Sequence, residues 1–249
     1  MSKLVSTYNP ATDEKLAEYV ALDREGLDLA LQASADAQRA WRSTDLKQRA
    51  QLLRNLATIL RDEVEAHATL ISNEMGKPIT EARGEVLKCA LTCDYYADHV
   101  EEYLAPKPVK TEAVTSYVAY EPIGVVLAVM PWNFPYWQVI RFAAPSLAAG
   151  NAGLLKHASN VTGSALAIQR AVERAGFPKG LFTTLVISDH SAVARIVEDT
   201  RVAAVTLTGS EGAGAQVAEA AGRSLKKTVL ELGGSDPFVV LGDADVEAI

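Results

Sequence analysis

The sequence predicts an α/β protein with a doubly wound, Rossmann-like parallel sheet, preceded by an N-terminal helical segment and an exposed strand. Up to about residue 103, apolar residues recur at three- and four-residue spacing, which is typical of amphipathic helices. From residue 122 onward, short continuous apolar runs alternate with helical segments. Such runs are typical of strands that are buried on both faces, as in βαβ units.

Three parts are expected along the chain. We expect residues 1–110 to form a helical segment that packs on the nucleotide domain, and residues 111–121 to form an extended strand or linker of the oligomerisation type. Residues 122–249 are expected to form a dinucleotide-binding α/β region. Within the first part, the apolar spacing predicts helices at 24–42, 46–74 and 79–103.

Local signals set the limits of these helices. Ser43, Thr44 and Asp45 are all able to cap the second helix, and Gly76 and Pro78 separate it from the third. Residues 113–120 alternate like a strand that is exposed on one face. In the last part, the apolar runs predict strands at 123–130, 152–157, 181–188, 202–208, 227–232 and 237–241.

Composition narrows the class of protein. With 24 Lys and Arg against 31 Asp and Glu, the net charge is −7, which makes nucleic acid or an anionic membrane an unfavourable partner. No apolar run is long enough for a membrane-spanning helix, and the N-terminus lacks a signal peptide's apolar core. Cys89 and Cys93, four residues apart on a predicted helix, are expected to be buried reduced thiols rather than a disulfide or a metal site. We therefore expect a cytoplasmic protein without a metal.

Polar or glycine-rich segments follow four of the predicted strands. In a doubly wound sheet, ligands bind beyond the carboxyl ends of the strands. The sequence places "MPWNFP", "KHAS", "TGSEGAG" and "ELGG" at such ends. Their coincidence at one edge of the sheet indicates a binding site there.

Two of these segments fit a dinucleotide. In "TGSEGAG", Gly209 allows a tight turn and Ser210 supplies a hydroxyl at the start of a helix, which suits either a phosphate or a plain capped loop. Lys156 ends a buried strand, where its ammonium group either reaches solvent or donates to ribose hydroxyls. Ser159 follows it as a small neutral side chain.

The other two segments offer catalytic groups. Asn133 lies between a strand and a helix, where its amide either caps the helix or donates to an oxyanion. Arg141 stands in an otherwise apolar helix and therefore needs an anion, from the protein or from a ligand. Glu231 at a strand end either pairs with a lysine such as Lys226 or Lys227 or acts as a general base.

These segments resemble the aldehyde dehydrogenase superfamily. The resemblance rests on "PWNFP" at 131–135, "AAGNAGLLKHAS" at 148–159, "TGS" at 208–210 and "LELGGSDP" at 230–237. The stretches "YNPATDEKLAEY", "MGKP" and "EPIGVV" match as well, so that the resemblance covers essentially the whole chain in order.

The resemblance implies a role for each site residue. Asn133 would stabilise the oxyanion of a thiohemiacetal, and Glu231 would activate the water that hydrolyses a thioester. The residues expected to contact the cofactor are Pro131, Trp132, Lys156 and Ser159 together with Gly209, Ser210, Leu232 and Gly233. Lys156 would hold the adenosine ribose, Gly209 and Ser210 would meet the pyrophosphate, and Leu232 and Gly233 would lie beside the nicotinamide.

Two positions refine the expected cofactor and substrate. Ser159 departs from the glutamate that is usual in NAD-type members, so that nothing there repels a 2′-phosphate, and NADP or the use of both NADP and NAD is expected. Arg141, eight residues past Asn133, resembles the arginine with which succinate-semialdehyde dehydrogenases bind the distal carboxylate of the substrate. Trp137 is expected to contact the substrate as well.

In this family the glutamate works with a cysteine that lies downstream, in a separate catalytic domain. Cys89 and Cys93 match no nucleophile position, so we expect this chain to be the N-terminal, cofactor-binding half, with the catalytic domain and its nucleophilic cysteine absent. The expected function is a segment of an NAD(P)-dependent enzyme that oxidises an aldehyde, succinate semialdehyde above others, to the acid. The complete enzyme is expected to be a homo-oligomer. The alternatives are a catalytically inactive nucleotide-binding fragment or an interaction protein.

Overall fold

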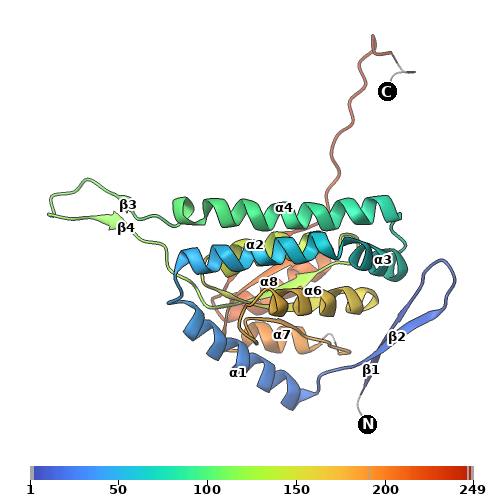
Figure 1. The fold of residues 1–249 in the computed structure, drawn as a ribbon, viewed down its shortest axis with the longest axis horizontal. Helices are drawn as coiled ribbons and strands as arrows, with labels where there is room; N and C mark the ends of the chain where they lie inside the picture. Colours follow the sequence, from blue (N-terminus) through green and yellow to red (C-terminus); the bar gives the residue numbers. More distant parts are fainter. Residues whose placement is uncertain (1–2, 190, 246, 248–249) are drawn as a thin grey trace.

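The structure is a computed structural model that describes residues 3–189, 191–245 and 247. A five-stranded parallel sheet lies at its centre, between layers of helices (Figure 1). Its strands are β5 (Val125–Met130), β6 (Ala152–His157), β7 (Phe182–Thr184), β8 (Val202–Thr208) and β9 (Lys227–Glu231). All four neighbouring pairs are parallel, which confirms the predicted fold class.

The spatial order of the strands is β7-β6-β5-β8-β9. The chain first builds outward from β5 to β7 and then crosses back to place β8 and β9 on the other side of β5. This reversal between β5 and β8 is the point at which open α/β sheets bind ligands beyond the carboxyl ends of their strands. The segments that follow β5 and β8 therefore flank the expected ligand position.

Each connection between the strands of the sheet contains a helix, and the bounds of these helices are α5 (Trp137–Ala148), α6 (Thr162–Arg174), α7 (Ser191–Glu198) and α8 (Glu211–Arg223). A short 3₁₀ turn, η1 (Ser159–Val161), precedes α6. α5 packs on α4, and α7 packs on α8. The fully buried side chains include Leu127, Ile140, Leu147, Leu154 and Leu155, so the strands and α5 share one core.

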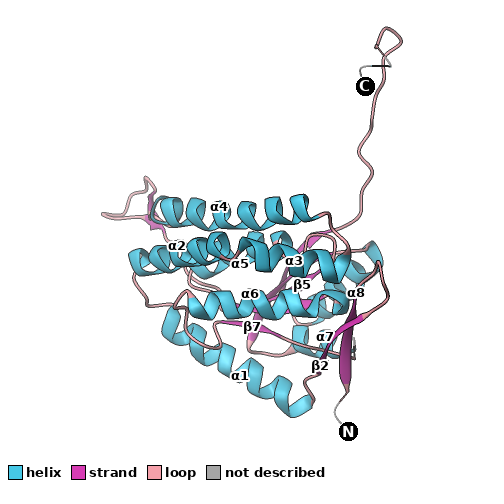
Figure 2. Cartoon of the chain, turned by 45° about the vertical axis from the view of Figure 1, so that its right-hand side comes forward, coloured by secondary structure: helices cyan, strands magenta, loops and turns pink. Residues whose placement is uncertain are grey.

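The N-terminal helices are α1 (Arg24–Trp41), α2 (Leu46–Asp62), α3 (Val64–Met75) and α4 (Ile79–Tyr103), and Figure 2 shows α2 and α4 stacked on one side of the sheet. The single helix predicted at 46–74 is wrong, because Glu63 leaves helical geometry with φ −107° and ψ 20°. The Glu63 carboxylate accepts hydrogen bonds from Arg174 of α6. After the break, α3 packs on α6. The apolar spacing in the sequence continues across Glu63 and therefore gives no sign of the break.

The helix ends follow the expected chemistry. Of the three candidate caps for α2, Asp45 is the one that acts, since its side chain accepts a hydrogen bond from the N–H of Lys47 at 2.8 Å. α3 ends at Gly76, whose φ of 76° lies in the left-handed region that glycine tolerates. The break predicted at Gly76 is therefore confirmed.

Two small hairpins modify the predicted N-terminal part. β1 (Leu4–Tyr8) pairs with β2 (Lys15–Val20), within the segment at 1–110 that was expected to be helical. β3 (Lys107–Pro108) pairs with β4 (Tyr117–Val118) and projects from the body of the molecule (Figure 1). The strand predicted at 113–120 is thus reduced to two residues. β2 and β4 are largely exposed, so their sequences lack the apolar runs that mark the central strands.

The strand predicted at 237–241 is wrong. Beyond β9 the described chain runs away from the sheet without pairing, and Phe238 is 79% exposed (Figure 1). Its apolar residues have the composition of a buried strand, but no described element covers them. No helix in the described part of the chain is long and apolar enough to cross a membrane.

Candidate cofactor and substrate site

The predicted site residues come together at one edge of the sheet. Asn133 follows β5, Lys156 is the next-to-last residue of β6, Gly209 and Ser210 follow β8, and Glu231 ends β9. Because the four strands are parallel, their carboxyl ends meet at this edge. The arrangement therefore agrees with a ligand site at the switch point between β5 and β8.

The segment after β5 is anchored by a residue that sequence reasoning missed. Glu85 of α4 accepts hydrogen bonds at Oε1 from the backbone N–H groups of Tyr136 at 2.8 Å and Trp137 at 2.9 Å. Its other oxygen pairs with Lys77, and both side chains are buried. Glu85 thus caps α5, a role that had been considered for Asn133. Within the described residues, the exposed Asn133 side chain makes no hydrogen bond, so its amide is available to a ligand.

His157 holds the same segment from the other side. Nδ1 of His157 lies 3.0 Å from the backbone nitrogen of Ala158 and 3.2 Å from the carbonyl oxygen of Met130, to which the Ala158 N–H also donates. Nε2 donates to the carbonyl oxygen of Pro135 at 2.9 Å. Burial lowers the pKa of His157 to about 4, so the ring is neutral near pH 7.

Two lysines contact the aromatic residues of this segment. The Lys77 ammonium group lies 3.7 Å from the centre of the Phe134 ring, and that of Lys88 lies 3.9 Å from the Trp137 ring. Such cation–π contacts contribute on the order of 1 kcal/mol each. Trp137, the expected substrate contact, is therefore half-buried on α5 beneath a cation from α4.

Lys156 is the buried cation of the cofactor half of the site. It is only 8% exposed, and burial lowers the pKa of its ammonium group. None of the ion pairs among the described residues includes Lys156. A buried ammonium group without a carboxylate gains from a ligand that supplies oxygen atoms. Ser159, by contrast, is exposed at the start of η1.

The turn after β8 is a capped helix start. Ser210 is the N-cap of α8, and its Oγ accepts a hydrogen bond from the N–H of Ala213 at 3.3 Å. The N–H of Gly209 donates to the carbonyl oxygen of Glu231 at 3.0 Å. Gly209 thus has no free N–H for a phosphate, whereas Ser210 still has its hydroxyl proton to donate.

Glu231 and Arg141 form an ion pair across this edge of the sheet. Arg141 Nη2 donates to Oε2 of Glu231 and, at 2.7 Å, to Oε1 of Gln138. Glu231 pairs with Arg141 rather than with the lysines considered for it, and Lys226 donates to the carbonyl oxygen of Asp199. The anion required by Arg141 is therefore supplied by the protein, from the residue predicted to be the general base.

Leu232 and Gly233 continue from Glu231 along the exposed chain. Leu232 packs on α8 at Gly214, where an added Cβ would lie only 2.5 Å from Leu232 Cδ2. A Cβ atom added to Gly233 would have no other atom within 4 Å. Leu232 is therefore placed by α8, and Gly233 leaves open space beside it.

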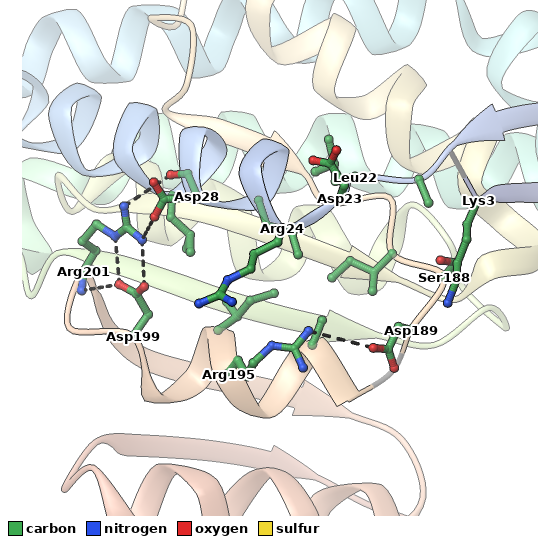
Figure 3. Close-up of a pocket in the computed structure, with 16 residues that line it drawn as sticks. Lys3, Leu22, Asp23, Arg24, Asp28, Ser188, Asp189, Arg195, Asp199 and Arg201 are labelled. Carbon is green, nitrogen blue, oxygen red and sulfur yellow. Dashed lines mark hydrogen bonds and ion pairs between the residues drawn. The ribbon is translucent and has the colours of Figure 1, made fainter. Parts of the chain in front are cut away.

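A separate cleft of about 750 Å³ lies between α1 and α7, away from the predicted site (Figure 3). None of the predicted site residues lines it. At one end Arg201 pairs with Asp28 and Asp199, and in the middle Arg24 and Arg195 extend toward each other (Figure 3). The lining carries four basic and four acidic side chains, so its net charge favours neither anions nor cations.

The comparison with known sequences assigns the family. A sequence model of the aldehyde dehydrogenase family matches residues 1–249. The chain belongs to the aldehyde dehydrogenase family. The resemblance first recognised in the strand-end segments is therefore confirmed over the whole chain.

Relatives within the family are similar in sequence and in structure. A probable NADP(+)-type succinate-semialdehyde dehydrogenase of Synechocystis is 51% identical over 243 residues, which are 98% of this chain and 53% of that protein. The NAD(P)+-type succinate semialdehyde dehydrogenase Sad of Escherichia coli is 47% identical, over 96% of this chain and 52% of that protein. The crystal structure of a Streptococcus pyogenes succinic semialdehyde dehydrogenase with NADP+ superposes with a TM-score of 0.93 at 42% identity, over 98% of this chain and 53% of that one.

The chain spans about half the length of the relatives that it matches. Its own cysteines do not fit the nucleophile of an aldehyde dehydrogenase. Cys89 and Cys93 are fully buried, and burial raises the pKa of both thiols, that of Cys93 to about 12. The expectation of two buried reduced thiols is confirmed. No group of His, Cys, Asp and Glu in the described part of the chain is arranged to hold a metal ion.

Proposed function

We propose that the chain is the N-terminal, cofactor-binding part of an NADP-dependent succinate-semialdehyde dehydrogenase. The contact between Arg141 and Glu231 carries this proposal, because it joins a carboxylate-binding cation and a carboxylate base at the ligand edge of the sheet. We divide the chain into a helical segment at 1–110, an oligomerisation strand at 111–121 and a dinucleotide-binding region at 122–249. The β3–β4 hairpin, which projects from the body, supports a role in contacts between copies.

The residues of the site fit a dinucleotide. The buried Lys156 ammonium group, which has no acidic partner among the described residues, would donate to the adenosine ribose. The Ser210 hydroxyl at the N-terminus of α8 would donate to the pyrophosphate, with Gly209 allowing the close turn. Ser159 leaves room and no negative charge for a 2′-phosphate, which favours NADP over NAD. Pro131, Trp132, Leu232 and Gly233 would line the nicotinamide end.

The substrate side follows from the groups at β5 and β9. The bound nicotinamide supplies the acceptor for a hydride. The free Asn133 amide would donate to the oxyanion of the reacting aldehyde, and Arg141, with Trp137 beside it, would hold the distal carboxylate of succinate semialdehyde. Glu231 would take a proton from the water that attacks the thioester, so that the acid leaves and the thiolate is restored.

We infer that the thiolate comes from the half of the relatives that this chain does not match. Cys89 and Cys93 are buried with raised pKa values and cannot supply it. The chain alone should therefore bind the cofactor but show no reduction of NADP with succinate semialdehyde. Turnover that survives a change of Glu231 and disappears on a change of Cys89 or Cys93 would show that the nucleophile lies in this chain. The alternative is a catalytically inactive nucleotide-binding fragment. Both readings predict that the chain binds the cofactor, so the binding experiment below tests both.

The experiment that tests the cofactor site is calorimetry of the chain with NADP and NAD. We expect NADP to bind at least as well as NAD, because Lys156 attracts the 2′-phosphate and Ser159 does not repel it. A charge at about 4 Å from that phosphate contributes roughly 1–4 kcal/mol, depending on the local dielectric. Ser159→Glu should reverse the order by about tenfold, or ~1.4 kcal/mol. Ser188→Glu, also at an exposed serine outside the predicted site, is the matched control and should change neither affinity. Preference for NAD in the unmodified chain, with no response to Ser159→Glu, would place the ribose elsewhere.

We further propose that the complete enzyme is a homo-oligomer in the cytoplasm and that it binds no nucleic acid. The two buried, unpaired thiols agree with a reducing compartment. The net charge of −7 disfavours a polyanionic partner.

A further inference from the structure

We propose that the ion pair between Arg141 and Glu231 is a latch that the distal carboxylate of the substrate opens. In the closed state the predicted base is bound to the predicted substrate-binding cation. An incoming carboxylate would take the place of Glu231 on Arg141 and free Glu231 to accept a proton from water. This inference rests on the proposed function and adds a regulation of the same site.

The surroundings of the pair allow this exchange without a change of fold. The backbone of Glu231 is fixed, because its carbonyl oxygen accepts a hydrogen bond from the N–H of Gly209 at 3.0 Å. The carboxylate has room to leave Arg141, since the Glu231 side chain is 48% exposed and that of Arg141 is 36% exposed. A small anion from solvent therefore reaches both partners, and only side-chain torsions have to change.

The geometry of the guanidinium group makes the two carboxylates compete. A guanidinium group binds a carboxylate bidentately either through Nε and Nη2 or through Nη1 and Nη2, so each arrangement needs an N–H of Nη2. Nη2 of Arg141 already donates to Gln138 and to Glu231. A bidentate ligand must therefore displace one of them. Glu231 is the one that leaves, because two carboxylates on one nitrogen repel each other, whereas the Gln138 amide is neutral.

The latch adds selectivity to the water-activating step. An acid semialdehyde that occupies Arg141 releases Glu231 for its role as base. An aldehyde without a distal anion leaves Glu231 paired, with its carboxylate oxygen directed at the guanidinium group rather than at water. The structure thus links recognition of one end of the substrate to the availability of a base at the other.

Succinate is the probe, because it carries the carboxylate of the substrate and needs no turnover. The full chain is titrated with succinate at fixed ionic strength, and its affinity is read from the NMR signals of the Arg141 side chain. Replacing Glu231 by Gln removes the competitor and should tighten succinate binding about two- to fivefold, the range that corresponds to ~0.4–1 kcal/mol. Arg141→Gln should abolish specific binding. In the unmodified chain, the Glu231 carboxyl carbon signal should move on addition of succinate toward its position in Arg141→Gln.

Glu231→Asp separates competition from general charge effects, because it keeps the negative charge and shortens the side chain. The latch predicts tighter succinate binding in Glu231→Asp as well, whereas a general charge effect predicts it only in Glu231→Gln. Equal affinity in the unmodified chain and Glu231→Gln, a carboxyl signal that ignores succinate, or no succinate binding in any variant would overturn the latch. NADP binding to the unmodified chain is measured separately, and its failure would count against the proposed function rather than the latch.

Discussion

The carboxylate of Glu85 on α4 accepts a hydrogen bond from the backbone N–H of Tyr136, 2.8 Å away at the start of α5. The two residues are far apart in sequence, and the contact is buried. The same carboxylate pairs with Lys77, whose ammonium group lies on the Phe134 ring. The segment that carries Asn133 is therefore fixed at its C-terminal end by the helical part of the chain, and its geometry depends on residues outside the α/β region.

Glu85→Gln should destabilise the chain by about 3 kcal/mol. The amide oxygen of Gln can still accept from the N–H groups of Tyr136 and Trp137, but Lys77 loses its counter-charge while it remains buried. Urea unfolding measures the change, with the exposed Glu81→Gln on the same helix as control. Adding Lys77→Met to Glu85→Gln should recover part of the loss, because the unpaired charge is removed. A double variant that is less stable by the sum of the two single changes would contradict this account.

His157 should make stability depend on pH in a definite window. Its pKa is lowered from 6.5 to about 4 in the folded chain, so the unfolded chain takes up the proton first as the pH falls. The contribution of the neutral His157 ring to the free energy of unfolding is complete above pH 6.5. It is lost progressively as the pH falls toward 4, by up to about 3 kcal/mol. Unfolding free energies of the unmodified chain and His157→Gln, measured from pH 7.5 to 4, should converge as the pH falls. His67, whose pKa burial also lowers, contributes to both curves and does not affect their difference.

The central sheet could be predicted because each strand carries its own signal. The runs that became β5, β6 and β8 are continuous and apolar, and they are bounded by polar or glycine-rich turns. The hairpins could not be predicted in the same way, since β2 and β4 are exposed and their pairing depends on a partner strand rather than on a local pattern. The run at 237–241 has the apolar composition of a strand but no described neighbour to pair with. Composition alone therefore predicted a strand that the structure does not contain.

The candidate site was predictable as far as it is made of strand ends. Lys156, Ser210 and Glu231 lie at or next to the carboxyl ends of strands, where doubly wound sheets bind their ligands. Glu85 could not be found this way, because a glutamate in a helix carries no sign of the distant N–H groups that it binds. The pairing of Arg141 with Glu231 also required the fold, since only the relative position of α5 and β9 decides which carboxylate the arginine meets.

Lys156→Met should stabilise the chain and at the same time remove cofactor binding. The buried ammonium group has a lowered pKa and no described ion-pair partner, so an apolar side chain of similar length should raise the free energy of unfolding by about 1 kcal/mol. Lys227→Met, at an exposed position of β9, is the control and should leave stability nearly unchanged. Chemical unfolding and calorimetry with NADP measure the two effects. Loss of stability in Lys156→Met would mean that the ammonium group has a partner that stabilises the fold.

The exposed edge of the sheet should make the chain associate with itself. Among the described strands β9 pairs only with β8, and Val229 on β9 is 61% exposed. Strands with one free edge and apolar side chains pair with other copies, and a charged residue on the strand opposes this. Sedimentation velocity over a range of concentrations should show association of the unmodified chain, weakened in Val229→Lys. Val114→Lys, at a fully exposed valine in the β3–β4 loop, controls for the added charge and should leave association as it is. If Val114→Lys is the variant that dissociates the chain, the projecting hairpin rather than the β9 edge holds the copies together.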